Sequence, residues 1–95
     1  MSVEWTPQAR ASLQTIVEFV AQDDPDAAYR LADGIVDRTE AILTNNPNAG
    51  RPGRVSGTRE LVAHKNYIIA YRVKKDQTVQ ALNVIHAARL WPQNF

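Results

Sequence analysis

The chain has 95 residues with 44% hydrophobic and 22% charged side chains, a formal net charge of +1 and no cysteine. This length fits one domain spanning residues 1–95 with one hydrophobic core, and the lack of cysteine excludes disulfides and thiolate metal sites. The two histidines have no local ligand pattern, so we expect no metal and no cofactor. The first residues lack a signal-peptide pattern and the apolar runs are too short to cross a bilayer. We therefore expect a cytoplasmic protein with no membrane contact.

The N-terminal half predicts a short strand followed by two helices. Val3–Trp5 alternates apolar and polar side chains, as a strand does. Thr6 and Pro7 then begin a helix, because threonine is a good N-cap and proline at the first helical position leaves no N–H unpaired. Asp24 and Pro25 begin a second helix in the same way. Each helix carries an apolar stripe: Ala9, Leu13, Ile16, Val17 and Val20 on the first, and Ala28, Leu31, Ala32, Ile35, Val36, Thr39, Ile42 and Leu43 on the second.

The C-terminal half predicts a loop followed by a sheet. Residues 45–54 are rich in Asn, Pro and Gly, which is typical of a loop throughout, and the period then changes to that of strands. Turns at 65–66 and 75–77 favour a three-stranded antiparallel meander, and the tail from 87 to 95 is expected to be irregular. The tight helical hairpin must bury its stripes, so we predict an α+β fold in which it packs on one face of that sheet. The three strands are expected at Thr58–His64, Tyr67–Lys74 and Thr78–His86.

Charge is sorted between the two halves of the chain. Residues 1–50 carry three arginines against eight acidic residues, a net charge of −5, whereas residues 51–95 carry eight basic residues against two acidic ones, a net charge of +6. A basic half of this kind favours a polyanionic partner, either nucleic acid or an acidic peptide segment, over a solubilising pattern with no partner.

Several basic residues are candidates for that contact. Arg51 and Arg54 flank a Pro-Gly pair and predict either a basic loop that touches phosphate or carboxylate, or a solvated connector. Arg59 and Glu60 are adjacent in a strand and therefore point to opposite faces, and one of them is expected to pair across the sheet. A structural role is favoured for Glu60, and the role of Arg59 stays open. Arg72 interrupts an apolar strand, so we expect it to face solvent or to be paired, and it is the best single binding candidate.

The other candidates carry no hard catalytic motif. His64 and Lys65 lie at an expected hairpin end, where a surface role is typical. His86 ends an apolar strand and is suited either to acid–base chemistry near neutral pH or to holding the tail in place, with the structural role favoured. Trp91 is expected to dock the tail on the core.

As a whole, the chain resembles the RelE/ParE superfamily of toxins from bacterial type II toxin–antitoxin modules. The resemblance spans nearly the full length and rests on segments that occur in order at the usual spacing. They are Val3–Pro7, the helical hairpin, Asn46–Pro52, Thr58–Val62, Tyr67–Val73, Val84–Arg89 and the Trp91-Pro92 pair.

This resemblance implies one of two mechanisms. RelE-like members cut mRNA in the ribosomal A site, whereas ParE-like members inhibit DNA gyrase and are not nucleases. RelE-like enzymes typically place an arginine near the start of the middle meander strand and finish with a cluster containing Tyr, His or Lys. Here the first charge in that strand is Arg72, near its far end, and no tyrosine follows Tyr71. These departures favour a ParE-like gyrase inhibitor, with growth inhibition and plasmid stabilisation as the implied roles.

The resemblance also implies partners and contact residues. The expected antitoxin is ParD-like, with an acidic, disordered C-terminal segment that folds on the toxin to form a heteromeric complex. If the chain is instead a ribonuclease acting on ribosome-bound mRNA, its catalytic candidates are His86, Arg72 and Arg89. A plain interaction module without toxicity is a third possibility. Candidates for target binding are Arg59, Arg72, His86, Arg89 and Trp91, and those for antitoxin binding are Leu13, Val17, Val20, Leu31, Ile35, Arg51 and Arg54.

Overall fold

The computed structural model describes residues 3–87, and in it Thr6 and Asp24 are the N-caps of the two helices, as predicted. The Thr6 hydroxyl accepts a hydrogen bond from the Ala9 N–H at 3.1 Å, and the Asp24 carboxylate accepts one from the Ala27 N–H at 3.1 Å. Both caps satisfy a backbone donor that has no partner within its helix. The helices are α1 (Pro7–Ala21) and α2 (Pro25–Asn45).

The predicted meander is confirmed, and it forms the centre of a larger mixed sheet. The strand order is β1-β5-β4-β3-β2, with β3, β4 and β5 antiparallel to one another. At one edge β1 pairs in parallel with β5, and at the other β2 pairs antiparallel with β3. The strands are β1 (Glu4–Trp5), β2 (Arg51–Pro52), β3 (Arg59–His64), β4 (Tyr67–Val73) and β5 (Val79–His86).

One segment differs from its prediction. Residues 45–54 are not a loop throughout, because α2 extends to Asn45 and because Arg51 and Pro52 pair with Glu60 and Arg59. A two-residue strand containing proline has no periodic pattern, and its position is set by its pairing with β3, seven to nine residues further along the chain.

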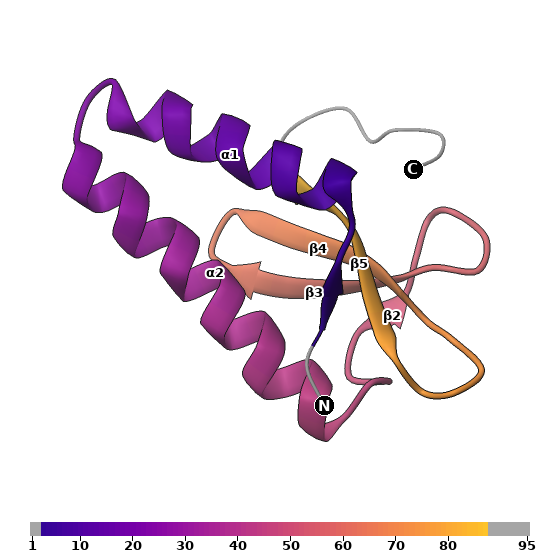
Figure 1. The fold of residues 1–95 in the computed structure, drawn as a ribbon. Helices are drawn as coiled ribbons and strands as arrows, with labels where there is room; N and C mark the ends of the chain where they lie inside the picture. Colours follow the sequence, from indigo (N-terminus) through magenta and orange to yellow (C-terminus); the bar gives the residue numbers. More distant parts are fainter. Residues whose placement is uncertain (1–2, 88–95) are drawn as a thin grey trace.

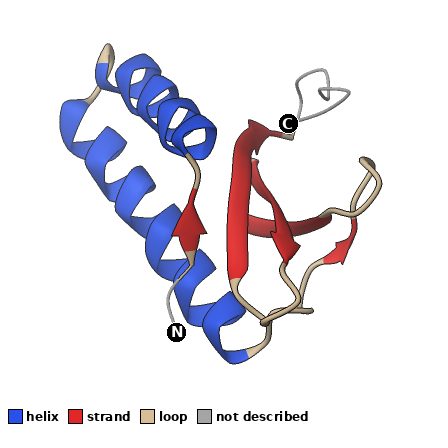
Figure 2. Ribbon diagram, turned by 45° about the vertical axis from the view of Figure 1, so that its right-hand side comes forward, coloured by secondary structure: helices blue, strands red, loops and turns tan. Residues whose placement is uncertain are grey.

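The fold has two layers, with the helical hairpin on one face of the sheet (Figures 1 and 2). In β4, Ile69 and Tyr71 belong to the hydrophobic core, and Tyr67 and Val73 pack against it, so these four side chains share the face toward the helices as the alternation predicts. Arg72 therefore belongs to the face away from the helices, and it is exposed. Within residues 3–87 no helix is long and apolar enough to span a membrane.

A bulge in β5 adjusts the sheet near α1. The pairing passes from Ala70 opposite Asn83 to Tyr71 opposite Ala81, which leaves Leu82 as the extra residue. The buried Asn83 side chain accepts a hydrogen bond from the Ser12 hydroxyl of α1 at 2.5 Å. This polar contact satisfies a buried amide oxygen and joins the two layers.

Candidate interaction surface

Glu60 holds the loop that carries Arg51 and Arg54. The Glu60 side chain is only 2% exposed, and one of its oxygens accepts hydrogen bonds from the Nε and Nη2 atoms of Arg51 at 3.3 and 3.1 Å. Its other oxygen accepts one from the Arg54 backbone N–H at 2.9 Å. Such charge-assisted bonds are about twice as strong as neutral ones. The structural role favoured for Glu60 is confirmed, and the Arg51 and Arg54 side chains remain 58% and 53% exposed.

Tyr71 and Arg59 fix the first part of the same loop. The buried Tyr71 hydroxyl donates to the Pro47 carbonyl at 2.9 Å and accepts from the Gly50 N–H at 2.8 Å. Arg59 is half-buried, and its Nη2 atom donates to the carbonyls of Asn48 and Gly50 at 3.0 and 2.7 Å. Arg59 thus stabilises the loop, which is a structural role that the sequence left open.

Arg72 lies at the other side of the sheet from the helices, in a row of polar side chains across three strands. Its Nε atom donates to the Gln80 Oε1 atom at 2.6 Å, and the Gln80 amide donates to Glu4 at 2.9 Å. Lys74 also contacts Glu4, at 3.5 Å. The expectation that Arg72 faces solvent is confirmed, and its hydrogen bond goes to a neutral partner, so its charge is available to an anion.

His86 lies at the opposite end of β5, beside the β3–β4 turn. It is half-buried, and its ring meets the Tyr67 ring edge-on, with centroids 5.1 Å apart and an interplanar angle of 87°. The His64 ring is 6.4 Å from the same tyrosine. His86 therefore packs at a small aromatic cluster at the end of the sheet, and edge-to-face packing of this kind stabilises the fold.

The strand register separates the two main catalytic candidates. Arg72 pairs with Gln80, whereas His86 pairs with Tyr67. Tyr67 and Arg72 are five residue steps apart in β4, which corresponds to about 17 Å along the strand. Arg89 and Trp91 lie outside the described residues. The structure therefore does not bring His86 and Arg72 into one site.

A groove between α2 and β3 is a feature that the sequence did not predict. It has a volume of about 520 Å³ and brings together Gly34 and Arg38 of α2 with Val62, Ala63, His64 and Lys65. Val62 is 52% exposed there. No local pattern relates the two segments, because they are far apart in sequence and meet through the packing of α2 on the sheet.

The antitoxin-binding candidates on the hairpin differ in accessibility. Leu13, Val17, Val20 and Leu31 are half-buried, but Ile35 is fully buried in the core and offers no surface to a partner in this structure. The helices also expose two aromatic side chains that lie off the predicted stripes, Phe19 at 62% and Tyr29 at 64%. Exposed aromatic residues are enriched in protein–protein interfaces.

The chain is similar to known toxins over almost its whole length. A family model described as the ParE toxin of the type II toxin–antitoxin system parDE matches residues 3–91. A relative called putative toxin Y4kP, from Sinorhizobium fredii, is 45% identical over 96% of this chain and 93% of its own length. Toxin RelE2 from Caulobacter vibrioides is 36% identical over 93% of this chain and 97% of its own length.

Solved structures give the same result. A chain of the chromosomal ParDE toxin–antitoxin system from P. aeruginosa matches with a TM-score of 0.77 and 31% identity, covering 90% of this chain and 95% of the other. A chain of the toxin–antitoxin complex RelBE2 from Mycobacterium tuberculosis matches with a TM-score of 0.57 and 26% identity, at the same coverage. The chain therefore belongs to the ParE family of toxins from type II toxin–antitoxin systems.

Proposed function

We propose that this toxin inhibits DNA gyrase in the cytoplasm and that a cognate antitoxin neutralises it. Family membership supports this target, because ParE-like toxins are expected to act on gyrase. Inhibition by binding requires an accessible surface and no acid–base machinery. The exposed Arg51, Arg54 and Arg72 side chains are suited to such a contact.

The separation of Arg72 and His86 is the observation that carries the proposal. Cleavage of RNA by attack of a ribose hydroxyl needs a base, an acid and a group that stabilises the charge on phosphate, all within reach of one phosphodiester. His86 and Arg72 are about 17 Å apart along β4, by the register and the rise of a strand, so one phosphodiester does not touch both. This argues against the pair as a ribonuclease site.

For the antitoxin, we propose an acidic segment that folds as it binds. A segment of this kind needs apolar anchors as well as charge. The accessible apolar side chains of the hairpin, with Phe19 and Tyr29 the most exposed, supply places for such anchors. Arg38 and Lys65 at the α2–β3 groove supply positive charge for acidic side chains.

The competing function is mRNA cleavage on the ribosome. The observation in its favour is the similarity to a protein named toxin RelE2. The two mechanisms leave different products, since one alters DNA topology and the other cuts messages. Plasmid topology and mRNA integrity in the same cells therefore separate them.

The experiment expresses the toxin from a tightly repressed promoter, with and without its antitoxin. We expect growth arrest with relaxed plasmid and chromosomal breaks, while mRNA stays intact over the first minutes. Antitoxin co-expression should restore growth and supercoiling. Messages cleaved within minutes at unchanged plasmid topology would instead establish the ribonuclease, and unaffected growth from folded protein would establish a non-toxic interaction module.

A further inference from the structure

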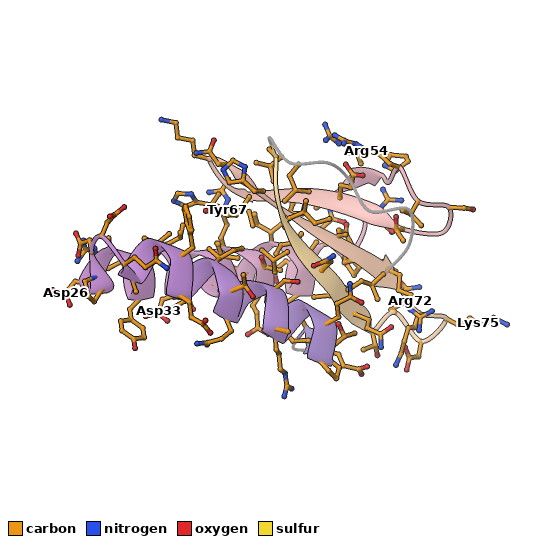
Figure 3. The ribbon with its side chains drawn as sticks, turned by 90° about the horizontal axis from the view of Figure 1, so that it is seen from above. Asp26, Asp33, Arg54, Tyr67, Arg72 and Lys75 are labelled. Carbon is orange, nitrogen blue, oxygen red and sulfur yellow. The ribbon has the colours of Figure 1, made fainter. Side chains whose placement is uncertain are left out.

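Charged side chains are unevenly distributed over the folded chain. Asp26 and Asp33 lie at one end of the molecule, and Arg54, Arg72 and Lys75 lie at the other (Figure 3). The second group comes from the loop after β2, from β4 and from the β4–β5 turn. Together with three neighbouring basic residues, Arg51 of β2, Arg59 of β3 and Lys74 of the β4–β5 turn, these three form what we call the basic end. The basic end is Arg51, Arg54, Arg59, Arg72, Lys74 and Lys75.

The basic end keeps a positive excess after its ion pairs are counted. Its six cations face three carboxylates in the same region, those of Glu4, Glu60 and Asp76, which leaves a charge of +3. Glu60 pairs with Arg51, and Glu4 contacts Lys74. Arg72 bonds to a neutral amide oxygen, and Lys75 is exposed. The whole chain carries only +1, so attraction of a polyanion depends on this local excess.

The composition of the basic end fits phosphate better than an acidic peptide. The most exposed large apolar side chains of the described residues are Phe19 and Tyr29 on the helices and Val62 in β3, all outside the basic end. A peptide that folds on binding needs apolar anchors, whereas contacts to a nucleic-acid backbone are made by Arg and Lys without them.

Part of the basic end is also held in place by hydrogen bonds. The Glu60 carboxylate fixes the loop of Arg51 and Arg54, and Gln80 orients Arg72. Side chains that are already ordered lose less conformational entropy when they bind, so the same charges give more affinity than they would on a flexible tail.

We propose that the basic end binds the phosphate backbone of double-stranded DNA. This deepens the proposed function and rests on it for the source of the phosphate, because gyrase holds a DNA duplex. In that complex, the toxin contacts the DNA through the basic end at the same time as it contacts the enzyme. Because the contact is to phosphate groups and not to base edges, we expect the same affinity for DNA of any sequence.

The test measures binding of the purified toxin alone to a fluorescent DNA duplex by anisotropy, between about 50 and 200 mM salt. The variant Arg72→Ala/Lys75→Ala removes two charges from the basic end. Its control is Arg10→Ala/Arg30→Ala, which removes two exposed charges from the helices and gives the same net charge. Thermal unfolding checks that both variants are folded.

The wild type and the control should bind alike. The Arg72→Ala/Lys75→Ala variant should bind at least about tenfold more weakly at the lowest salt. The plot of the logarithm of its association constant against the logarithm of salt concentration should be less steep by about two. Absence of wild-type binding at the lowest salt, or equal loss in both variants, would overturn the proposal. Equal affinity for a polyglutamate peptide would overturn the assignment to nucleic acid, and much tighter binding to duplex RNA would overturn the assignment to DNA.

This experiment contains no gyrase, so its failure is distinct from failure of the proposed function. A toxin that inhibits gyrase and does not bind DNA would leave the proposed function standing and remove this inference. A toxin that binds DNA through the basic end and leaves gyrase unaffected would support DNA binding and remove the proposed function.

Discussion

Arg72 and His86 lie at opposite ends of the same pair of strands, since Arg72 is opposite Gln80 and His86 is opposite Tyr67. Residues this far apart, with no shared partner, usually contribute independently to stability and binding. Residues that act together in one catalytic site are not independent, because removal of either residue already abolishes the catalytic activity that needs both.

We therefore expect the effects of Arg72→Ala and His86→Gln on toxin potency to be additive. The measurement is a double-mutant cycle, with the toxin concentration for half-maximal inhibition of gyrase supercoiling as its readout. The free-energy changes of the two single variants should sum to that of the double variant within about 0.5 kcal/mol. If each single change weakens the toxin, a double variant no weaker than the more damaged single variant would indicate a shared site and contradict the account.

The Tyr71 hydroxyl should stabilise the fold through its two loop contacts. Tyr71→Phe leaves the Pro47 carbonyl and the Gly50 N–H without this partner in a buried position. The free energy of unfolding should fall by about 1–3 kcal/mol, measured by urea denaturation. Tyr29→Phe, at an exposed position of α2, is the matched control and should change it by no more than about 0.5 kcal/mol. Equal free energies of unfolding for the Tyr71→Phe and Tyr29→Phe variants would show that the Tyr71 hydroxyl does not fix the loop.

Gly50 leaves no room for a side chain. A Cβ atom there would lie 2.6 Å from the Glu60 carbonyl oxygen and 2.7 Å from the Tyr71 hydroxyl. Gly50→Ala should therefore reduce the free energy of unfolding by about 1–3 kcal/mol, as overpacking does. In contrast, Gly34→Ala should raise it by about 0.5–1 kcal/mol, because Gly34 lies in α2 with open space around it. A stable Gly50→Ala protein in the same denaturation assay would contradict this close packing.

The stability of the protein should depend on pH through Asp76, which lies in the β4–β5 turn. The Asp76 carboxylate accepts a hydrogen bond from the Thr78 backbone N–H at 2.9 Å, and this bond, with a contribution from the Thr78 hydroxyl, lowers the pKa of Asp76. A pKa that is lower in the folded state means that the ionised form stabilises the fold. This stabilisation is present at neutral pH and is lost as the pH falls below about 4, through the folded-state pKa.

Asp76→Asn should accordingly be less stable than the wild type at pH 7, and the difference should shrink as the pH falls through this range. Denaturation midpoints of the two proteins at a series of pH values test this. A difference that stays constant with pH would show that the charge of Asp76 has no part in the turn.

Local sequence signals predicted most of the fold. The caps at Thr6 and Asp24 and the alternation in β4 depend on neighbouring residues, and all of these predictions are confirmed. The parallel pairing of β1 with β5 and the short strand β2 were missed. The position of β1 is set by contacts between residues far apart in the chain, such as the hydrogen bond from the Thr6 N–H to the Ala81 carbonyl. The position of β2 is set by its pairing with β3, because two residues are too few to show the alternation of a strand.

The surface was less predictable than the fold. Exposure of Arg72 followed from the cost of burying an unpaired guanidinium. For Glu60 the sequence favoured a structural role without naming its partner, Arg51. No sequence pattern predicted the groove at Arg38 and Val62, because the groove is formed only where α2 packs against β3. The full burial of Ile35 was likewise not evident, since a stripe residue under the sheet and one at its margin have the same helical spacing.

The most direct test of the central claim is a supercoiling and DNA-cleavage assay with purified components. Toxin is added to DNA gyrase and relaxed plasmid, with and without antitoxin. We predict loss of supercoiling and accumulation of DNA cleaved and linked to gyrase, both reversed by antitoxin. Unchanged gyrase activity in the presence of folded toxin that arrests growth in cells would contradict gyrase as the target, and ribosome-dependent mRNA cleavage would then be the mechanism to examine.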